Sequence, residues 1–205
     1  MKKIICLALS LSLVLCLASC SGYGTPDDVV TELYGAQDAE SFYDAVIKAV
    51  PTDLQEDMLN YGKVKKDAFK DMLMEEYGDY DEYGKNIEVK NSTEYSKSET
   101  HDFIKDFSDD AKDILDSFDP SDISSVWTVE FTLGDNERED IVFKLNGNYY
   151  SYKACCDIFF NVVAWWSIIV NCKSKVEFRK TEPWPAQFFH SKNRPISFYK
   201  LPLII

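Results

Sequence analysis

One histidine in the acidic part of the chain is a side chain that could act as a general base or a metal ligand. His101 lies in residues 98–102, at the expected start of a helix, with Asp102 beside it. A histidine base is oriented by a partner and a zinc site needs several ligands. Because no second histidine supports either role in this part of the chain, we favour a solvated side chain in a first helical turn.

A second candidate is an acidic loop that partly resembles a calcium-binding loop. Asp79, Asp81 and Gly84 match positions one, three and six of an EF-hand loop. Position five would be Tyr83 and position twelve Lys90, where an oxygen ligand and a bidentate glutamate are required. We therefore favour a polar connector between a helix and a strand, and we predict no metal site.

Tyrosines could line a pocket or a sugar-binding face, because each offers a flat apolar ring with a polar tip. The alternative is that they form the amphipathic edges of a core. The residues concerned are Tyr77, Tyr80, Tyr83, Tyr95, Tyr149, Tyr150 and Tyr152. The sequence carries no nucleophile elbow, phosphate-binding loop or paired-cysteine metal motif, and we predict no catalytic residue and no cofactor.

The most specific motif is at the start of the chain. Met1 to Lys3 are followed by an apolar run over residues 4–17, which has the length of a signal-peptide core and is too short for a membrane span. The run ends in Leu17-Ala18-Ser19-Cys20, which resembles the lipobox of bacterial lipoproteins. The resemblance implies removal of residues 1–19, lipidation of the Cys20 thiol, and a membrane anchor on the extracytoplasmic side. Residues 20–24 are then predicted to be a short tether.

Charge divides the rest of the chain into two parts. Residues 21–153 carry 32 acidic and 13 basic side chains, a net charge of −19, whereas residues 154–205 carry 3 acidic and 7 basic ones. Such an acidic domain repels phosphate backbones, so nucleic acid is excluded as a partner. It also repels anionic headgroups, which makes a covalent lipid more necessary for membrane attachment.

Residues 25–153 are predicted to form one α+β domain. Helical spacing predicts helices from Pro26, Asp38 and Thr52 and a fourth around residues 68–78, with Thr52 and Gln55 forming a capping box. A half-buried strand follows, with Ile87, Val89, Thr93 and Tyr95 on one face. A long helix is then expected as far as residue 118, with a three-stranded antiparallel meander over residues 127–152.

This order of elements resembles the nuclear transport factor 2-like superfamily, also called cystatin-like. The closing residues Asn146-Gly147-Asn148-Tyr149-Tyr150 look like the penultimate turn and aromatic strand of that fold. The resemblance implies N-terminal helices and a long helix packed on a curved antiparallel sheet, in a cone-like shape. Enzymes with this fold place a carboxylate, histidine or tyrosine inside the cone.

Residues 154–205 differ in composition, with three of the four tryptophans and cysteines 155, 156 and 172. Three interpretations stay open. The tail is a short membrane segment, although its uninterrupted apolar core over residues 158–170 is shorter than a span. It is a further buried strand of the sheet, or it is a frameshift or read-through product. We favour the last of these.

Together these patterns predict a lipid-anchored, extracytoplasmic and non-catalytic binding module. The expected contact surface for a small apolar ligand or an envelope protein is Trp127, Phe131, Tyr149 and Tyr150. One alternative is an isomerase or dehydratase, which would need an inward carboxylate, while strand alternation places Glu88 and Glu130 outward. Another is an envelope-maintenance protein whose acidic surface meets a basic partner.

Overall fold

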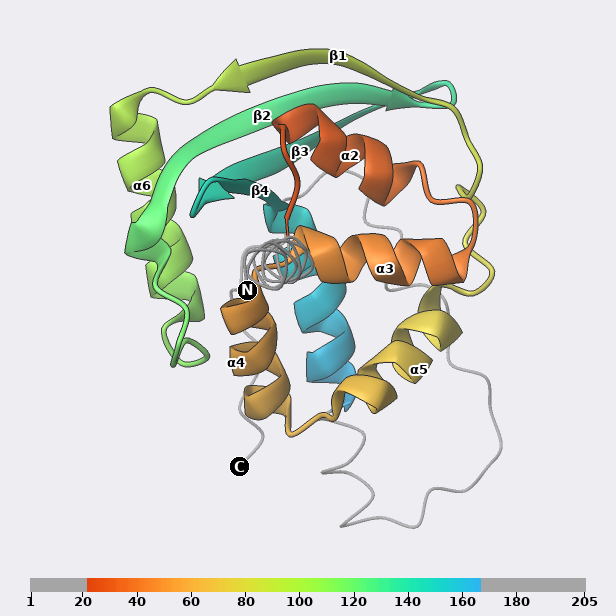
Figure 1. Ribbon diagram of the computed structural model, residues 1–205, viewed down its shortest axis with the longest axis horizontal. Helices are drawn as coiled ribbons and strands as arrows, with labels where there is room; N and C mark the ends of the chain where they lie inside the picture. The colour runs from red at the N-terminus through yellow and green to blue at the C-terminus, as the bar shows by residue number, and fades with distance from the viewer. Residues whose placement is uncertain (1–21, 167–205) are drawn as a thin grey trace, which may run out of the picture.

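A computed structural model describes residues 22–166 and has the predicted α+β class. Helices come first, a further helix separates the first strand from the other strands, and a helix closes the described part (Figure 1). The signal peptide, Cys20 and residues 167–205 lie outside the described residues. The elements are α2 (Pro26–Tyr34), α3 (Ala39–Ala49), α4 (Thr52–Gly62), α5 (Lys66–Tyr77), β1 (Ile87–Glu94), α6 (Lys97–Ala111), η1 (Pro120–Asp122), β2 (Ile123–Leu133), β3 (Asn136–Leu145), β4 (Asn148–Ser151) and η2 (Ala154–Phe160).

The sheet is antiparallel, with strand order β1-β2-β3-β4. Asn146 and Gly147 connect β3 to β4 with φ values of 51° and 87°. Both values lie in the left-handed region that a two-residue hairpin turn requires, and asparagine and glycine tolerate it best. The Asn-Gly hairpin predicted from the sequence is therefore confirmed.

The register assigns the inner side chains to two faces. Val129 pairs with Asp140 and Phe131 with Arg138, so these four side chains share one face. Helix α2 covers that face, with the Tyr34 ring 4.8 Å from the Phe131 ring. Val126, Phe143 and Tyr150 lie on the other face, where they meet α6. Both faces of the sheet are thus partly covered.

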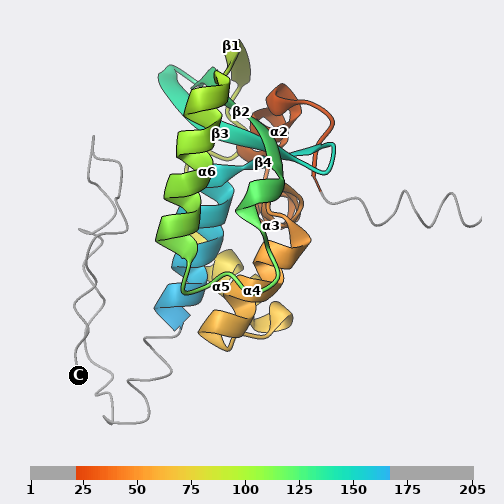
Figure 2. The same ribbon diagram turned by 90° about the vertical axis from the view of Figure 1, so that its left-hand side faces the viewer.

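Helix α6 packs against the sheet and against the helix that follows β4 (Figure 2). The Phe107 ring lies 6.0 Å from Phe143 and 5.4 Å from Tyr152. The helix ends at Ala111, earlier than predicted, although Phe118 is buried as expected. The chain leaves the helical path because the buried Asp57 carboxylate accepts hydrogen bonds from the amides of residues 116–118, at 2.8–3.0 Å.

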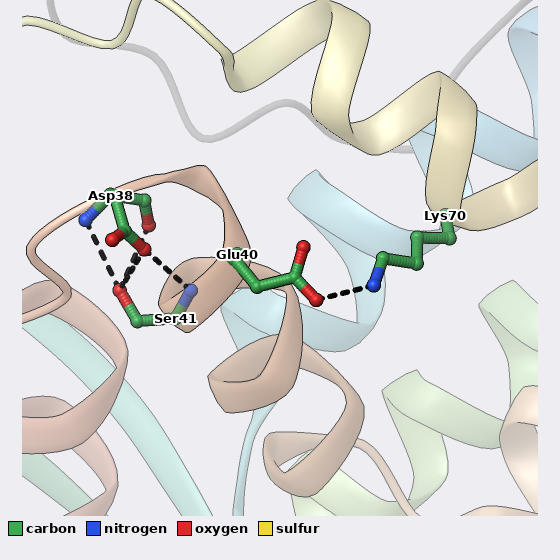
Figure 3. A network of polar contacts seen from close by, with 4 residues as sticks. All are labelled: Asp38, Glu40, Ser41 and Lys70. Carbon is green, nitrogen blue, oxygen red and sulfur yellow. Dashed lines mark hydrogen bonds and ion pairs between the residues drawn. The ribbon is translucent and has the colours of Figure 1, made fainter.

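Side-chain caps define the early helices. Asp38 and Ser41 form a reciprocal capping box at the start of α3, and Glu40 pairs with Lys70 of α5 (Figure 3). The helix start predicted at Asp38 is confirmed. The predicted box at Thr52 and Gln55 is wrong, because α4 has no side-chain cap. Gln55 Nε2 instead donates to the carbonyls of Ile47 and Val50, which the end of α3 leaves free.

Strand β1 contains a bulge that the alternation did not predict. Its pairing with β2 slips between Val89 and Asn91, and beyond the slip Ser92 is half-buried while Thr93 is exposed. An extra residue moves all later side chains to the opposite face. The prediction that Thr93 shares a face with Ile87 and Val89 is therefore wrong.

The domain does not end at Lys153. Residues 152–166 are helical, and Phe159 is fully buried with its ring stacked 4.0 Å from Phe69. Val163 packs closely against Gly62 of α4. A Cβ added at Gly62 would lie only 2.2 Å from Val163 Cγ1. This part of the predicted tail is a core helix and not a strand, and the frameshift interpretation stays a prediction. No helix among residues 22–166 is long and apolar enough to cross a bilayer.

Candidate functional site

The structure divides the four residues of the predicted contact surface. Trp127 and Tyr149 are half-exposed and meet edge to face, with ring centroids 5.1 Å apart. Phe131 is 2 % exposed beneath Tyr34, and Tyr150 is 4 % exposed on the opposite face of the sheet. These four side chains do not form one surface, and only the pair Trp127 and Tyr149 is available to a partner.

The two carboxylates examined in the sequence point outward, but another points inward. Glu88 and Glu130 are exposed, as strand alternation predicts. Asp140 on β3 is 2 % exposed, and its Oδ2 accepts hydrogen bonds from the hydroxyls of Tyr34 (3.1 Å) and Ser151 (2.6 Å). Its Oδ1 is buried and has no hydrogen-bond partner among the described residues. The burial of Asp140 was not predicted, because the alternation of Ile141, Phe143 and Leu145 indicates only one buried face of β3.

Burial changes the acid–base behaviour of this carboxyl. Desolvation raises the pKa of Asp140 from 3.8 to about 6, although the hydroxyls of Ser151 and Tyr34 and the nearby Lys153 ammonium act in the opposite direction. Burial and the Asp140 charge also raise the pKa of the Tyr34 phenol well above 10. The pair therefore offers a carboxyl that titrates near neutral pH and a phenol that keeps its proton.

Asp140→Asn is expected to stabilise the fold increasingly as the pH rises from 4 to 7. The folded state of the wild type binds a proton more tightly than the unfolded chain, so its stability falls with rising pH across this window. A difference of about two pKa units corresponds to roughly 3 kcal/mol in full, of which about 2.4 kcal/mol develops between pH 4 and pH 7. Urea unfolding of both proteins across this range measures it. A difference independent of pH would contradict a buried, titrating Asp140.

A pocket of about 130 Å³ is lined by Tyr34, the hydrogen-bond partner of this carboxyl, and lies between α2, α3, the α5–β1 connector, the sheet and η2. Its aromatic wall comes from Tyr34, Phe42, Tyr77 and Tyr80. The rings also contact one another, with the Phe42 centroid 5.1 Å from Tyr77 and Tyr77 5.9 Å from Tyr80. Three of the predicted pocket tyrosines, Tyr77, Tyr80 and Tyr83, cluster in this region, with Tyr83 5.4 Å from Tyr80.

The acidic loop that partly resembles a calcium site forms one rim of the pocket. Glu82 is 9 % exposed and accepts hydrogen bonds from Arg138 Nη2 (2.8 Å) and from the Tyr80 hydroxyl. Burial alone would raise the pKa of Glu82, but Tyr80, Arg138 and Lys85 together hold it below its usual value. Gly84, with φ +70°, allows the chain to turn toward β1. The loop is a connector held to β3 by Glu82.

Two cations also line the pocket. Arg138 is the only arginine between residues 22 and 166, and its side chain is 42 % exposed. Lys153 Nζ lies 6.0 Å from the centre of the Tyr34 ring and has no ion pair within 4 Å among the described residues. Asp157, one turn further along η2, completes the charged lining. The lining thus carries two cations and two carboxylates, Glu82 and Asp157, in a domain with a net charge of −19.

Comparison with known proteins adds no assignment: no protein family, curated protein or solved structure matches the chain. The pocket can hold a flat apolar group against tyrosine rings and an anionic group beside Arg138 and Lys153. His101 is exposed in the second turn of α6, one turn later than expected, and is not part of the pocket lining.

Proposed function

We propose that this chain is a lipid-anchored, extracytoplasmic binding module of the cell membrane. The lipobox at Leu17–Cys20 supports the anchor, and the order of helices and antiparallel strands supports a cone-like domain similar to the nuclear transport factor 2-like superfamily. The observation that carries the binding role is the tyrosine-walled pocket with Arg138 and Lys153 at its rim.

The ligand class follows from the size and charge of the pocket. A volume of about 130 Å³ is well below the roughly 300–1,000 Å³ of sites for drug-sized molecules. It fits one ring-sized group, either a small ligand or one end of a larger one. Because Glu82 is already paired, the cations available to a ligand are Lys153 and the outer nitrogens of Arg138. We therefore propose a small ligand with a flat apolar body and one carboxylate.

A ligand pair with the same phenyl ring and either a carboxylate or a neutral hydroxyl at its polar end tests this proposal. The mature protein should bind phenylacetate about tenfold more tightly than 2-phenylethanol, because one charge-assisted hydrogen bond contributes roughly 1.5 kcal/mol. Calorimetry or ligand-observed NMR measures both affinities. Arg138→Lys keeps a charge beside Glu82 but loses the planar fork, so it should reduce the preference. Exposed Lys105→Gln on α6 is the matched control and should leave it unchanged. Equal affinity for the two ligands would reject the carboxylate class.

The enzyme alternative gains one specific observation, the inward Asp140 with its pKa of about 6. A carboxyl that titrates near neutral pH suits proton transfer in an isomerase or dehydratase. Against it, Asp140 is covered by Tyr34 and does not line the pocket. An enzyme of this kind would lose turnover in Asp140→Asn, whereas a binding module would keep its affinity for the carboxylate ligand.

A further inference from the structure

Gly22, the first residue that the structure describes, is fixed by a hydrogen bond and by close packing. The Gly22 amide donates to the carbonyl of Lys48 at 2.9 Å, at the end of α3. Its φ of +98° favours glycine, and a Cβ at this position would lie 2.6 Å from Asn148 Cβ and 2.8 Å from Tyr150 Cζ. Gly22 is therefore held between α3 and β4.

The next residue extends the sheet. Tyr23 exchanges two backbone hydrogen bonds with Tyr149 of β4, at 3.0 and 2.9 Å, and the segment runs past β4 before α2 begins (Figure 1). The Tyr23 ring is 3 % exposed, and its hydroxyl donates to the Ala45 carbonyl. The flexible tether predicted for residues 20–24 is thus part of the folded domain from residue 22 onward.

Aromatic and basic side chains surround this entry point. Trp127 and Tyr149 present half-exposed rings, Lys144 Nζ lies 5.0 Å from the centre of the Tyr149 ring, and Lys48 Nζ lies 4.1 Å from that of Tyr23. We call these five residues the entry edge. Tryptophan and tyrosine rings with polar tips are enriched at membrane–water interfaces, and lysines near an anionic surface are attracted to it. Asp28 and Glu32 of α2 lie nearby, and Glu94 of β1 is the cross-strand partner of Trp127, so acidic side chains border the entry edge as well as the two lysines.

We propose that the entry edge lies against the bilayer surface, with the Trp127 and Tyr149 rings at the level of the headgroups of an anionic membrane. This inference rests on the proposed lipid at Cys20. Only Ser21 separates that residue from Gly22, and two residues span at most about 7 Å. A domain that is already rigid at Gly22 cannot move away from the surface on so short a connection.

This orientation also places the pocket. Arg138 lies six residues before Lys144 along β3, which at about 3.4 Å per residue puts the pocket rim roughly 20 Å along the strand from the entry edge. The pocket rim and the entry edge then lie on the same face of the sheet but at different positions along β3, so a ligand can reach the pocket without contacting the entry edge. The entry edge and the pocket are separate surfaces with separate tests.

The test uses the mature lipidated protein, reconstituted into vesicles of phosphatidylcholine and phosphatidylglycerol with brominated acyl chains. Subtracting the emission of Trp127→Phe from that of the wild type isolates the Trp127 signal. We expect brominated lipid to reduce this signal about twofold, because the ring lies at the interface. Inserting about ten Gly and Ser residues between Ser21 and Gly22 allows a separation of roughly 17 Å, and quenching should then disappear.

The outcomes separate the two proposals. Protein that floats with the vesicles but shows equal Trp127 emission in brominated and unbrominated lipid would overturn the membrane-facing entry edge and leave the anchor intact. Protein that does not float would overturn both. Quenching that persists with the long spacer would contradict the role of the short connection, because the entry edge would then bind the bilayer without it.

Discussion

Phe159→Ala should lower the free energy of unfolding by about 3–5 kcal/mol, the range found when a buried phenylalanine is truncated. Phe159 has no exposed surface and stacks on the equally buried Phe69 at 4.0 Å. The substitution opens a cavity between η2 and α5 that neither helix can close without moving the other. Since small domains are stable by only about 5–15 kcal/mol, the variant should unfold at a clearly lower urea concentration.

Tyr61→Ala is the matched control, because Tyr61 is an aromatic residue of α4 that is 51 % exposed, and it should cost less than about 1 kcal/mol. A chain that stops after Lys153 should not fold at all, since it also lacks Ile158, Val162 and Val163. If Phe159→Ala unfolds like the wild type, the helix after Lys153 does not belong to the core. The prediction that the domain ends at Lys153 would then be correct.

Asp57→Ala should cost about 4 kcal/mol, because it removes the acceptor of three backbone amides, each in a charge-assisted bond of roughly 1.5 kcal/mol. Those amides belong to Asp116, Ser117 and Phe118, in the connection from α6 to η1. The loss should be measurable by urea unfolding near pH 7. It should be accompanied by faster amide hydrogen exchange in residues 112–119, the segment that Asp57 holds.

The effect of Asp57 should also depend on pH in a defined direction. Burial opposes its ionisation, but the three amides outweigh burial, so the pKa of Asp57 is lowered in the folded state. Its stabilisation is therefore present above the unfolded pKa and is lost as the pH falls through the folded pKa. Glu56→Ala, an exposed carboxylate on the same helix, is the control and should change stability little. A loss no larger than that of Glu56→Ala would contradict the capping role.

Local signals in the sequence predicted the parts of the fold that depend on neighbouring residues. The Asp38 cap, the Pro26 start of α2 and the Asn146-Gly147 hairpin each require only a few residues in the correct order, and the structure has all three. The exposure of Glu88 and Glu130 was predictable for the same reason, since strand alternation is local.

The features that were missed depend on contacts between distant residues. Asp57 binds amides about 60 positions away, and Asp140 is buried because α2 and the helix after β4 cover its face of the sheet. The bulge in β1 is defined only by its register with β2. The composition of residues 154–166 indicated a separate tail. In the structure, their apolar side chains instead pack against α4 and α5. None of these four features can be predicted without knowing which distant residues pack against the segment concerned.

We propose that Cys20 carries the lipid that holds this domain at the membrane. Intact mass spectrometry of the protein extracted from cell membranes tests it most directly, together with Cys20→Ala. We expect a chain that begins at Cys20 with a diacylglyceryl group on its thiol, and a Cys20→Ala protein without that addition. A mature protein that begins at another residue, or that carries an unmodified Cys20, would contradict the account.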